Sequence, residues 1–349
     1  MIYVFIPIIA LLLFYNIKFK PFNQYYDDCL SKEQTSCING LFVIIIFISH
    51  FKKYIATLST ADSILYRTPL LFSQLVVVSF LFYSGFGLME SYKKKGQEYI
   101  STFPQKRFLK VFLDFALALL LFLLVQTILG KTYSVKHILL SFTGLVSIGN
   151  SCWYMFAIFT FYIIVYLSFT IFRNNKYGAL ILATLLSIAY MLCFHFLLSN
   201  FESYFYDTYL CLIFGMWFSV FKDYFMNFIN KWYTYISIFL FLITSLFVLY
   251  FFLGSNPFVF NVISIIFSIL LVMVTMKIKI QNPILAWIGK HTFWIYIIQR
   301  LPMIVLRHLG LNNVNTILFF FTSLVVTLLL SWLLQKLSNL VQHFILKKA

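Results

Sequence analysis

The stretch SFLFYSGFGLMESYKKKGQEYISTFPQKRFLKVFLD, residues 79–114, joins one apolar run to the next through a basic loop. Three consecutive lysines, Lys93 to Lys95, close the first run, and Arg107 and Lys110 open the second. Apolar runs that end in clustered cations are typical of helices that cross a membrane and emerge at its charged surface.

Composition places the whole chain in the same class. Of its 349 residues, 62% are hydrophobic, 21% are aromatic and only 10% are charged, which cannot be arranged around a single soluble core. We therefore expect an all-α transmembrane bundle. A span needs about 20 apolar residues, and this length predicts eleven spans, near 2–17, 38–57, 69–91, 107–129, 152–172, 178–198, 205–221, 233–253, 258–276, 285–306 and 315–335.

The first run resembles a signal peptide in length, but no basic segment precedes it and no small-x-small site follows it, so we expect an uncleaved helix. We expect residues 1–33 to form an N-terminal transmembrane helix and a cytoplasmic loop. Residues 34–349 would form the main membrane domain. We expect no soluble domain of useful size.

The 26 Lys and Arg residues predict the orientation, because such residues accumulate in cytoplasmic loops. The loops between eleven spans lie alternately on the two sides of the membrane. This arrangement places 19 of the Lys and Arg residues on one side and six on the other, with Arg300 left inside a span. The smaller group is Lys52, Lys53, Arg67, Lys131, Lys136 and Arg307. The multi-pass chain should therefore have its N-terminus outside the cell membrane and its C-terminus in the cytoplasm.

The net charge of +16 is explained by this topology and by contact with anionic membrane lipids, so we expect no nucleic-acid partner. Five cysteines show no C-x-x-C spacing and are odd in number. They predict neither a metal site nor a disulfide framework.

Polar residues inside the spans are the candidates for chemistry, since such residues face protein or a wet cavity. Asn39 and His50 lie eleven residues apart, about three turns, and so share one helical face. An imidazole can act as a base or a nucleophile near neutral pH, which makes His50 the best catalytic candidate. The alternative is a histidine that hydrogen-bonds between packed helices.

Three further places carry candidate binding residues. Ser84, in the stretch Ser84-Gly85-Phe86-Gly87, lies where backbone polar groups could face a cavity, although paired glycines more often allow close helix packing. Arg107 and Lys110 form a cationic cluster that could hold phosphates, or a helix end whose side chains reach the membrane surface. Arg300 must find a partner within the bundle or serve a site, because a central arginine costs roughly 2.5–3.5 kcal/mol.

Four stretches, in this order, resemble the acyltransferase-3 family of integral-membrane O-acyltransferases, which modify bacterial polysaccharides and other surface molecules. They are NGLFVIIIFISHF at 39–51, FLFYSGFGLMESYKKK at 80–95, KRFLKVF at 106–112 and WIGKHTFWIYIIQRLP at 287–302, and the resemblance covers roughly residues 34–335. It implies a ten-helix core behind one added N-terminal helix.

The resemblance also implies roles for residues. His50 matches the essential histidine of the family, whereas Asn39 stands where a basic residue is expected. Arg107 and Lys110 match the family's Arg-x-x-Arg pattern, with a lysine that lacks bidentate geometry. Gln299 occupies a position where many relatives have histidine, and we assign it no catalytic role.

The activity that the resemblance implies is transfer of an acetyl group from cytoplasmic acetyl-coenzyme A to a hydroxyl of a surface polysaccharide or lipid-linked glycan. His50 would deprotonate the hydroxyl or relay the acyl group as an acyl-imidazole, and no bound cofactor is expected. A transporter or flippase of glycan intermediates is the alternative from another class, and a purely structural membrane protein is a third.

Overall fold

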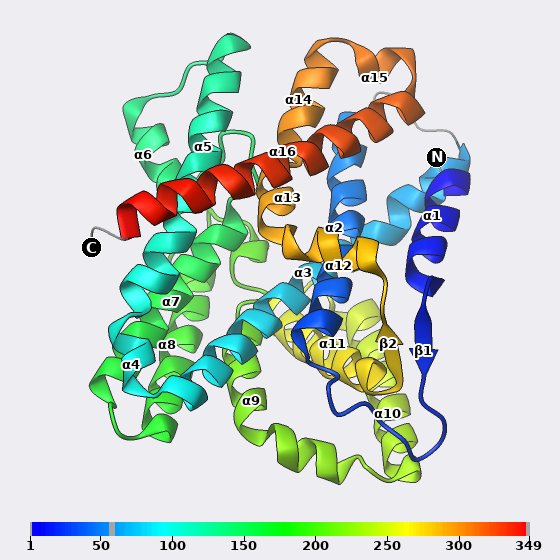
Figure 1. Ribbon diagram of the computed structural model, residues 1–349, viewed down its shortest axis with the longest axis vertical. Helices are drawn as coiled ribbons and strands as arrows, with labels where there is room; N and C mark the ends of the chain where they lie inside the picture. Colours follow the sequence, from blue (N-terminus) through cyan, green and yellow to red (C-terminus); the bar gives the residue numbers. More distant parts are fainter. Residues whose placement is uncertain (1, 56–59, 347–349) are drawn as a thin grey trace.

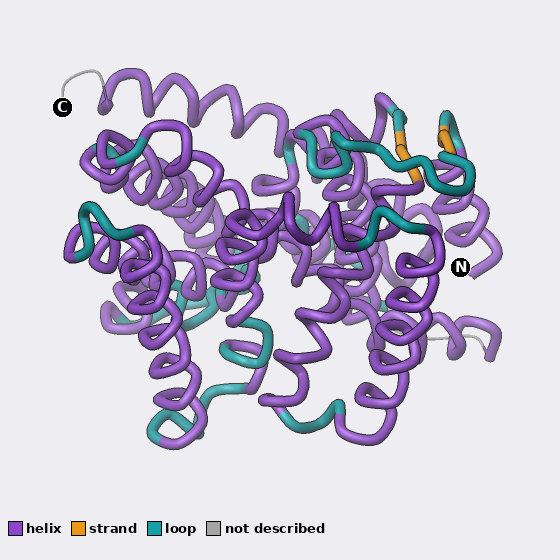
Figure 2. Tube along the Cα trace, turned by 90° about the horizontal axis from the view of Figure 1, so that it is seen from below, coloured by secondary structure: helices purple, strands orange, loops and turns teal. Residues whose placement is uncertain are grey.

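A computed structural model describes residues 2–55 and 60–346 of the chain, with side chains described for 7–55 and 74–345. The side chains of Arg67, Lys347 and Lys348, which the charge count includes, lie outside this description. Figures 1 and 2 show a helical bundle with one small sheet at its edge, which confirms the predicted all-α class.

The described helices and strands follow one another along the chain in this order. The first half contains α1 (Ile2–Phe14), β1 (Ile17–Phe19), α2 (Lys32–Phe51), η1 (Lys52–Tyr54), α3 (Thr60–Lys95), α4 (Gln97–Ser101), η2 (Pro104–Leu109), α5 (Lys110–Ile128), α6 (Val135–Thr143) and α7 (Trp153–Ile171). The second half contains α8 (Lys176–Phe196), η3 (Ser203–Phe205), α9 (Leu210–Phe228), α10 (Trp232–Leu253), α11 (Pro257–Lys277), β2 (Ile278–Ile280), α12 (Pro283–Lys290), α13 (Thr292–Ile298), α14 (Arg300–His308), α15 (Leu311–Val314) and α16 (Thr316–Leu346).

Within residues 2–55 and 60–346, nine helical segments are long and apolar enough to cross a membrane. Two of the eleven predicted spans are not among them. The run near 2–17 forms α1, a helix of 13 residues that is followed by β1. The run near 285–306 is divided into the three short helices α12, α13 and α14. The count of eleven therefore stays a prediction.

The small sheet marks one side of the bundle, which we call the sheet side. β1 pairs antiparallel with β2, so that Lys18 lies opposite Lys279. Gln34, near the start of α2, donates a hydrogen bond to the carbonyl of Ile278 at 3.0 Å and accepts one from the amide of Ile280 at 3.1 Å. Because α2 starts here and rises about 1.5 Å per residue, its last turn lies about 24 Å away on the opposite side.

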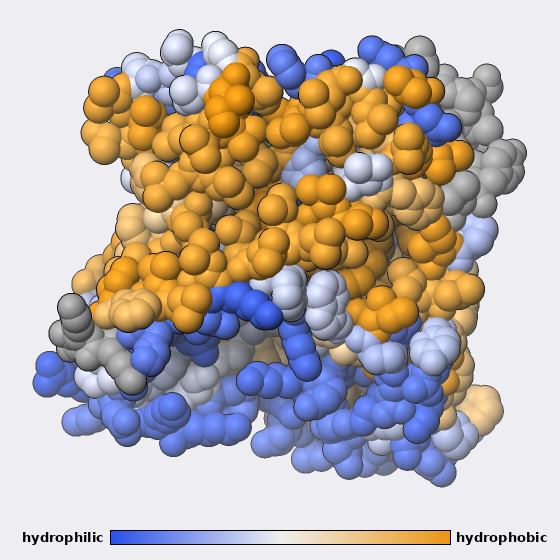
Figure 3. All heavy atoms as spheres, turned by 45° about the horizontal axis from the view of Figure 1, so that its top comes forward, coloured by the Kyte–Doolittle hydropathy of each residue, from blue (hydrophilic) through white to orange (hydrophobic). Residues whose placement is uncertain are grey.

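The outer surface has the pattern of a membrane protein. Figure 3 shows a broad hydrophobic band with hydrophilic residues gathered along its lower edge and fewer at its upper edge. Phe241, Phe251 and Phe252 of α10 are all exposed, which suits a helix that faces lipid.

Glycines allow two pairs of helices to touch through their backbones. A side chain on Gly85 of α3 would lie 1.8 Å from the carbonyl oxygen of Leu212 in α9, and one on Gly215 of α9 would lie 2.2 Å from that of Phe82. On α2, a side chain on Gly40 would lie 2.1 Å from the carbonyl oxygen of Leu285 in α12. The structure thus supports the close-packing interpretation of Gly85.

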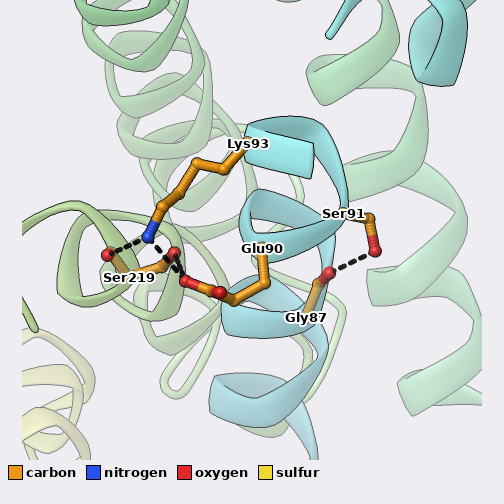
Figure 4. A network of polar contacts seen from close by, with 5 residues as sticks. All are labelled: Gly87, Glu90, Ser91, Lys93 and Ser219. Atoms are coloured by element: carbon orange, nitrogen blue, oxygen red, sulfur yellow. Dashed lines mark hydrogen bonds and ion pairs between the residues drawn. The ribbon is translucent and has the colours of Figure 1, made fainter. Parts of the chain in front are cut away.

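The C-terminal end of α3 is also joined to the middle of α9 by polar contacts (Figure 4). Lys93 donates to the carboxylate of Glu90 at 2.7 Å and to the backbone carbonyl of Ser219 at 3.0 Å. The Ser219 hydroxyl donates to the same carboxylate at 2.7 Å. The first lysine of the triplet therefore has a structural role in addition to its topological one.

The glycine contacts predict different effects for two neighbouring positions. Gly85→Ala should destabilise the folded protein by about 1–3 kcal/mol, because the new methyl group overlaps the α9 backbone. Gly87→Ala is the matched control, since nothing lies within 4 Å of a side chain placed there. Thermal unfolding of the two variants in detergent should show a lower midpoint for Gly85→Ala alone. Equal midpoints would contradict the close approach of α3 and α9.

Candidate active site

His50 lines a cavity of about 320 Å³ at the end of α2 that is remote from the sheet. We call this the His50 cavity. Five parts of the chain build it, namely the end of α2 with η1, the middle of α3, the segment 147–153, η3, and the α13–α14 junction. Its lining residues include His50, Lys52, Lys53, Gln74, Asn150, Ser151, Cys152, Trp153, Tyr204, Tyr296 and Arg300.

Asn150 shapes the wall that lies between α6 and α7. Its side-chain oxygen accepts a hydrogen bond from the amide of Ile148 at 3.1 Å, and its carbonyl accepts one from the Ser147 hydroxyl at 2.6 Å. Gln126 of α5 holds the same turn by donating to the carbonyl of Ile148 at 3.0 Å. Gly149 has φ +111°, and a side chain there would lie 2.5 Å from the Gln126 amide nitrogen. The wall is therefore fixed before any ligand binds.

Arg300 points into the bundle, as the cost of a charge in lipid requires. Its Nε donates to the Tyr54 hydroxyl at 3.0 Å, and its Nη1 donates to the carbonyl of Asn150 at 3.3 Å. The guanidinium also lies 5.9 Å from the centre of the Tyr54 ring. Both hydrogen-bond acceptors are neutral, so these contacts position the arginine without cancelling its charge.

A second cavity, of about 280 Å³, continues the polar path toward the sheet side. We call it the Ser84 cavity, and it is lined by Asn39, Phe80, Tyr83, Ser84, Tyr154, Thr292, Phe293 and Tyr296. Tyr296 lines both cavities, with its ring centre 6.4 Å from that of His50 and 5.3 Å from that of Tyr154. The face of α2 that carries Asn39 and His50 thus borders both cavities.

The polar groups along this path are poised for ligands. The Nδ1 atom of His50, the side-chain oxygen of Asn39, the Tyr83 hydroxyl and the Asn150 amide nitrogen are buried and have no hydrogen-bond partner among the described residues. An unpaired buried polar atom costs about 1–3 kcal/mol. A histidine that served only packing would have its ring nitrogen satisfied, so this geometry favours a functional His50.

Cys152 also lines the His50 cavity, but its thiol is a poor nucleophile. Burial raises the pKa of Cys152 to about 11, so the thiol is protonated near neutral pH. Among the described residues that line the cavity, His50 is therefore the side chain best suited to proton transfer.

The structure places the other predicted site residues apart from this cavity. Ser84 lines the second cavity. Arg107 and Lys110 line neither cavity; Arg107 lies in η2, where its Nε donates to the Tyr99 hydroxyl at 3.0 Å, and Lys110 is exposed. η2 is a π-helix, an irregularity that often occurs at functional sites.

Two acidic residues near these segments, Asp114 and Asp207, are held by hydrogen bonds inside the bundle. Asp114 accepts hydrogen bonds from Ser338 and, at 2.7 Å, from Gln342, both of α16. Lys110 and Asp114 lie one turn apart in α5, where Asp114 is buried against α16 and Lys110 is exposed, and the π-helix changes the phase of Arg107 relative to both.

Asp207 is only 4% exposed. It accepts hydrogen bonds from the Gln74 amide and from the Ser203 hydroxyl. Because Gln74 lines the His50 cavity, Asp207 fixes the Gln74 side chain from behind the cavity wall. His195 of the same region donates to or accepts from the Tyr206 hydroxyl at 3.1 Å.

Gln74, Asn150, Tyr204 and Tyr296 are site residues that sequence reasoning missed. Asn150 and Gln74 are single polar residues without a motif, and their role depends on contacts between distant segments. Tyr296 lies within the stretch 287–302 that carries the family resemblance, four residues before Arg300. One helical turn places residues four apart on one face, so this spacing was the available signal.

The chain matches the family model described as an acyltransferase domain over residues 37–336. No curated protein and no solved structure matches it. Since the matched region covers most of the chain and includes both cavities, the protein belongs to the acyltransferase-3 family of membrane acyltransferases.

Proposed function

We propose that the protein is an O-acyltransferase that moves an acetyl group from acetyl-coenzyme A to a hydroxyl of a surface polysaccharide or lipid-linked glycan. The observation that carries the proposal is the unpartnered ring nitrogen of His50, at a cavity that shares Tyr296 with a second cavity. A transferase with two substrates needs two such spaces that meet at one reactive group.

The donor is assigned to the sheet side of the path. Arg107 lies in η2 and Lys110 begins α5. Both follow the lysine triplet that ends α3, so their charges suit the phosphates of coenzyme A. Asn39 and Ser84 offer polar groups inside the Ser84 cavity, along which the thioester arm would reach Tyr296. The glycan would enter the His50 cavity from the opposite side.

In the proposed step, His50 takes the proton of the acceptor hydroxyl as the acceptor oxygen attacks the thioester carbonyl carbon. The C–S bond then breaks, and the coenzyme A thiolate receives the proton as it leaves. His50 returns to its starting form, and an ester and a free thiol are produced. Arg300 lies in the same cavity and would stabilise negative charge on the reacting oxygen.

This route requires a defined orientation, with the sheet side and the C-terminus in the cytoplasm. Single cysteines introduced at Lys94 and Glu202 should react with impermeant reagents from opposite sides of the membrane. The native cysteines are replaced first, so that each signal belongs to one position. Labelling of both positions from the same side would contradict the orientation and the donor route.

His50→Gln should lower acetyl transfer by about 100-fold or more, because glutamine keeps hydrogen bonding but cannot accept the proton. The measurement is transfer of labelled acetyl groups from acetyl-coenzyme A to glycans in membranes, at matched protein levels. His308→Gln is the control, since His308 is exposed and lines neither cavity. Substantial transfer by a well-expressed His50→Gln protein would remove the chemical role of His50 and favour glycan transport instead.

Arg107→Ala should raise the KM for acetyl-coenzyme A about tenfold or more, since a hydrogen bond to a charged group contributes roughly 1.5–3 kcal/mol. The KM for the glycan should change little. Lys110→Arg should be tolerated, because it restores the family's pattern. Arg173→Ala, an exposed change next to α7, is the control. If the KM for acetyl-coenzyme A were unchanged in Arg107→Ala, the Arg107–Lys110 cluster would serve only as a topological signal.

A further inference from the structure

The His50 cavity is cationic, which bears on the acceptor. Lys52, Lys53 and Arg300 line it, and no Asp or Glu of the described chain does. Asp207 contacts the lining residue Gln74, but its carboxylate is buried behind that side chain and is hydrogen-bonded there. A ligand in this cavity therefore meets positive charge.

The positive charge is not explained by topology. The sequence assigns only six Lys and Arg residues to the side opposite the sheet, and two of them, Lys52 and Lys53, line this one cavity. Cations on that side oppose the usual bias. Arg300 adds a third cation inside a span, where a charge is costly. The presence of Lys53 and Arg300 at this cavity, against these tendencies, indicates a local use.

The partners of Arg300 point to the same use. Its described hydrogen bonds go to a tyrosine hydroxyl and a backbone carbonyl, both of them neutral, although a guanidinium has five N–H donors. Lys53 is exposed at the cavity. An anion that bound between them would form charge-assisted hydrogen bonds that are roughly twice as strong as neutral ones.

The remaining walls suit a sugar. Trp153, Tyr204 and Tyr296 line the cavity and present large, rigid faces with polar tips. Trp153 and Tyr204 contact each other with ring centres 5.9 Å apart. A carbohydrate ring could pack on these faces while its hydroxyl reaches His50. The phosphates of coenzyme A are assigned to the other end of the path, so the donor does not account for these cations.

We propose that the acceptor is an anionic glycan, which carries a carboxylate or phosphate close to the acylated hydroxyl and holds that anion against Lys53 and Arg300. This inference rests on the proposed function and adds the chemical class of the acceptor. Because both anions share the same chemistry, the experiment distinguishes them.

The test uses purified full-length protein in a neutral detergent, so that anionic lipids do not compete. Three acceptors of equal length are compared: a tetrasaccharide of glucose, the same compound with one 6-phosphate, and a tetrasaccharide of glucuronic acid. Transfer of labelled acetyl from acetyl-coenzyme A should favour one or both anionic acceptors. This preference should fall as the salt concentration is raised from about 0.05 M to about 0.5 M, because the Debye length shortens from about 14 Å to about 4 Å.

Variants then locate the anion site. Lys53→Glu should lower kcat/KM for the anionic acceptors by about fivefold or more relative to the neutral acceptor, since a charge at the edge of a site acts mainly on charged partners. Lys53→Arg should retain the preference. Lys131→Glu is the matched control, because Lys131 is an exposed cation assigned to the same side and does not line the cavity.

Two results would overturn the inference while the proposed function survives. The first is transfer to the neutral acceptor that equals or exceeds transfer to both anionic acceptors. The second is an equal loss of kcat/KM for all three acceptors in Lys53→Glu. Absence of transfer to every acceptor would instead count against the proposed function. Equilibrium dialysis with the same three glycans then decides the inference, because preferential binding of anionic glycans that Lys53→Glu abolishes would uphold it. Equal binding of all three would overturn it.

Discussion

The backbone contact between α2 and α12 fixes the candidate active site. Gly40 and Gly289 face the partner backbones, and a side chain at either position would lie 2.1 Å or 1.8 Å from a carbonyl oxygen. α2 carries Asn39 and His50, while α12 leads directly into the helices that carry Tyr296 and Arg300. The absence of two side chains therefore determines how closely His50 approaches the groups around it. Packing and chemistry depend on the same contact.

The absence of water in a bilayer explains why these residues converge. A polar group inside a span must face protein or a cavity, because lipid offers it no partner. In α2, eleven residues are buried within the protein, whereas α10 buries only Tyr235 and Leu246. α10 is correspondingly apolar, and α2 carries the histidine. The division between helices that contact lipid and helices that line the cavities is thus already present in their polar content.

This division made much of the fold predictable from the sequence. Apolar run length predicted the long helices, and the spacing of Asn39 and His50 predicted a shared face, which borders both cavities. The break between α12, α13 and α14 was not predictable from hydropathy, since all three short helices lie within one apolar run. The π-helix η2 was also not predictable, because an argument from residue spacing assumes a regular α-helix.

The candidate site was less predictable, because its walls come from segments far apart in the chain. Residue type singled out His50 and Arg300, which are rare inside spans. Nothing local distinguished Asn150, whose carbonyl accepts from Arg300, or Gln74, which Asp207 holds in place. Their roles exist only once α3, α9 and the segment before α7 are assembled. Single polar residues that act through long-range contacts produce no periodic pattern in the sequence.

The two ends of the polar path differ in how their cations are satisfied. On the sheet side, Lys93 pairs with Glu90, Lys279 pairs with Asp28, and Lys277 donates to the backbone carbonyls of Pro21 and Gln24. These lysines anchor loops and helix ends, so a topological role with internal partners accounts for them. At the other end, the described hydrogen-bond partners of Arg300 are neutral, and Arg300 lines the same cavity as His50. A charge whose partners leave it uncancelled, in a preformed cavity, is better explained by a ligand than by the fold.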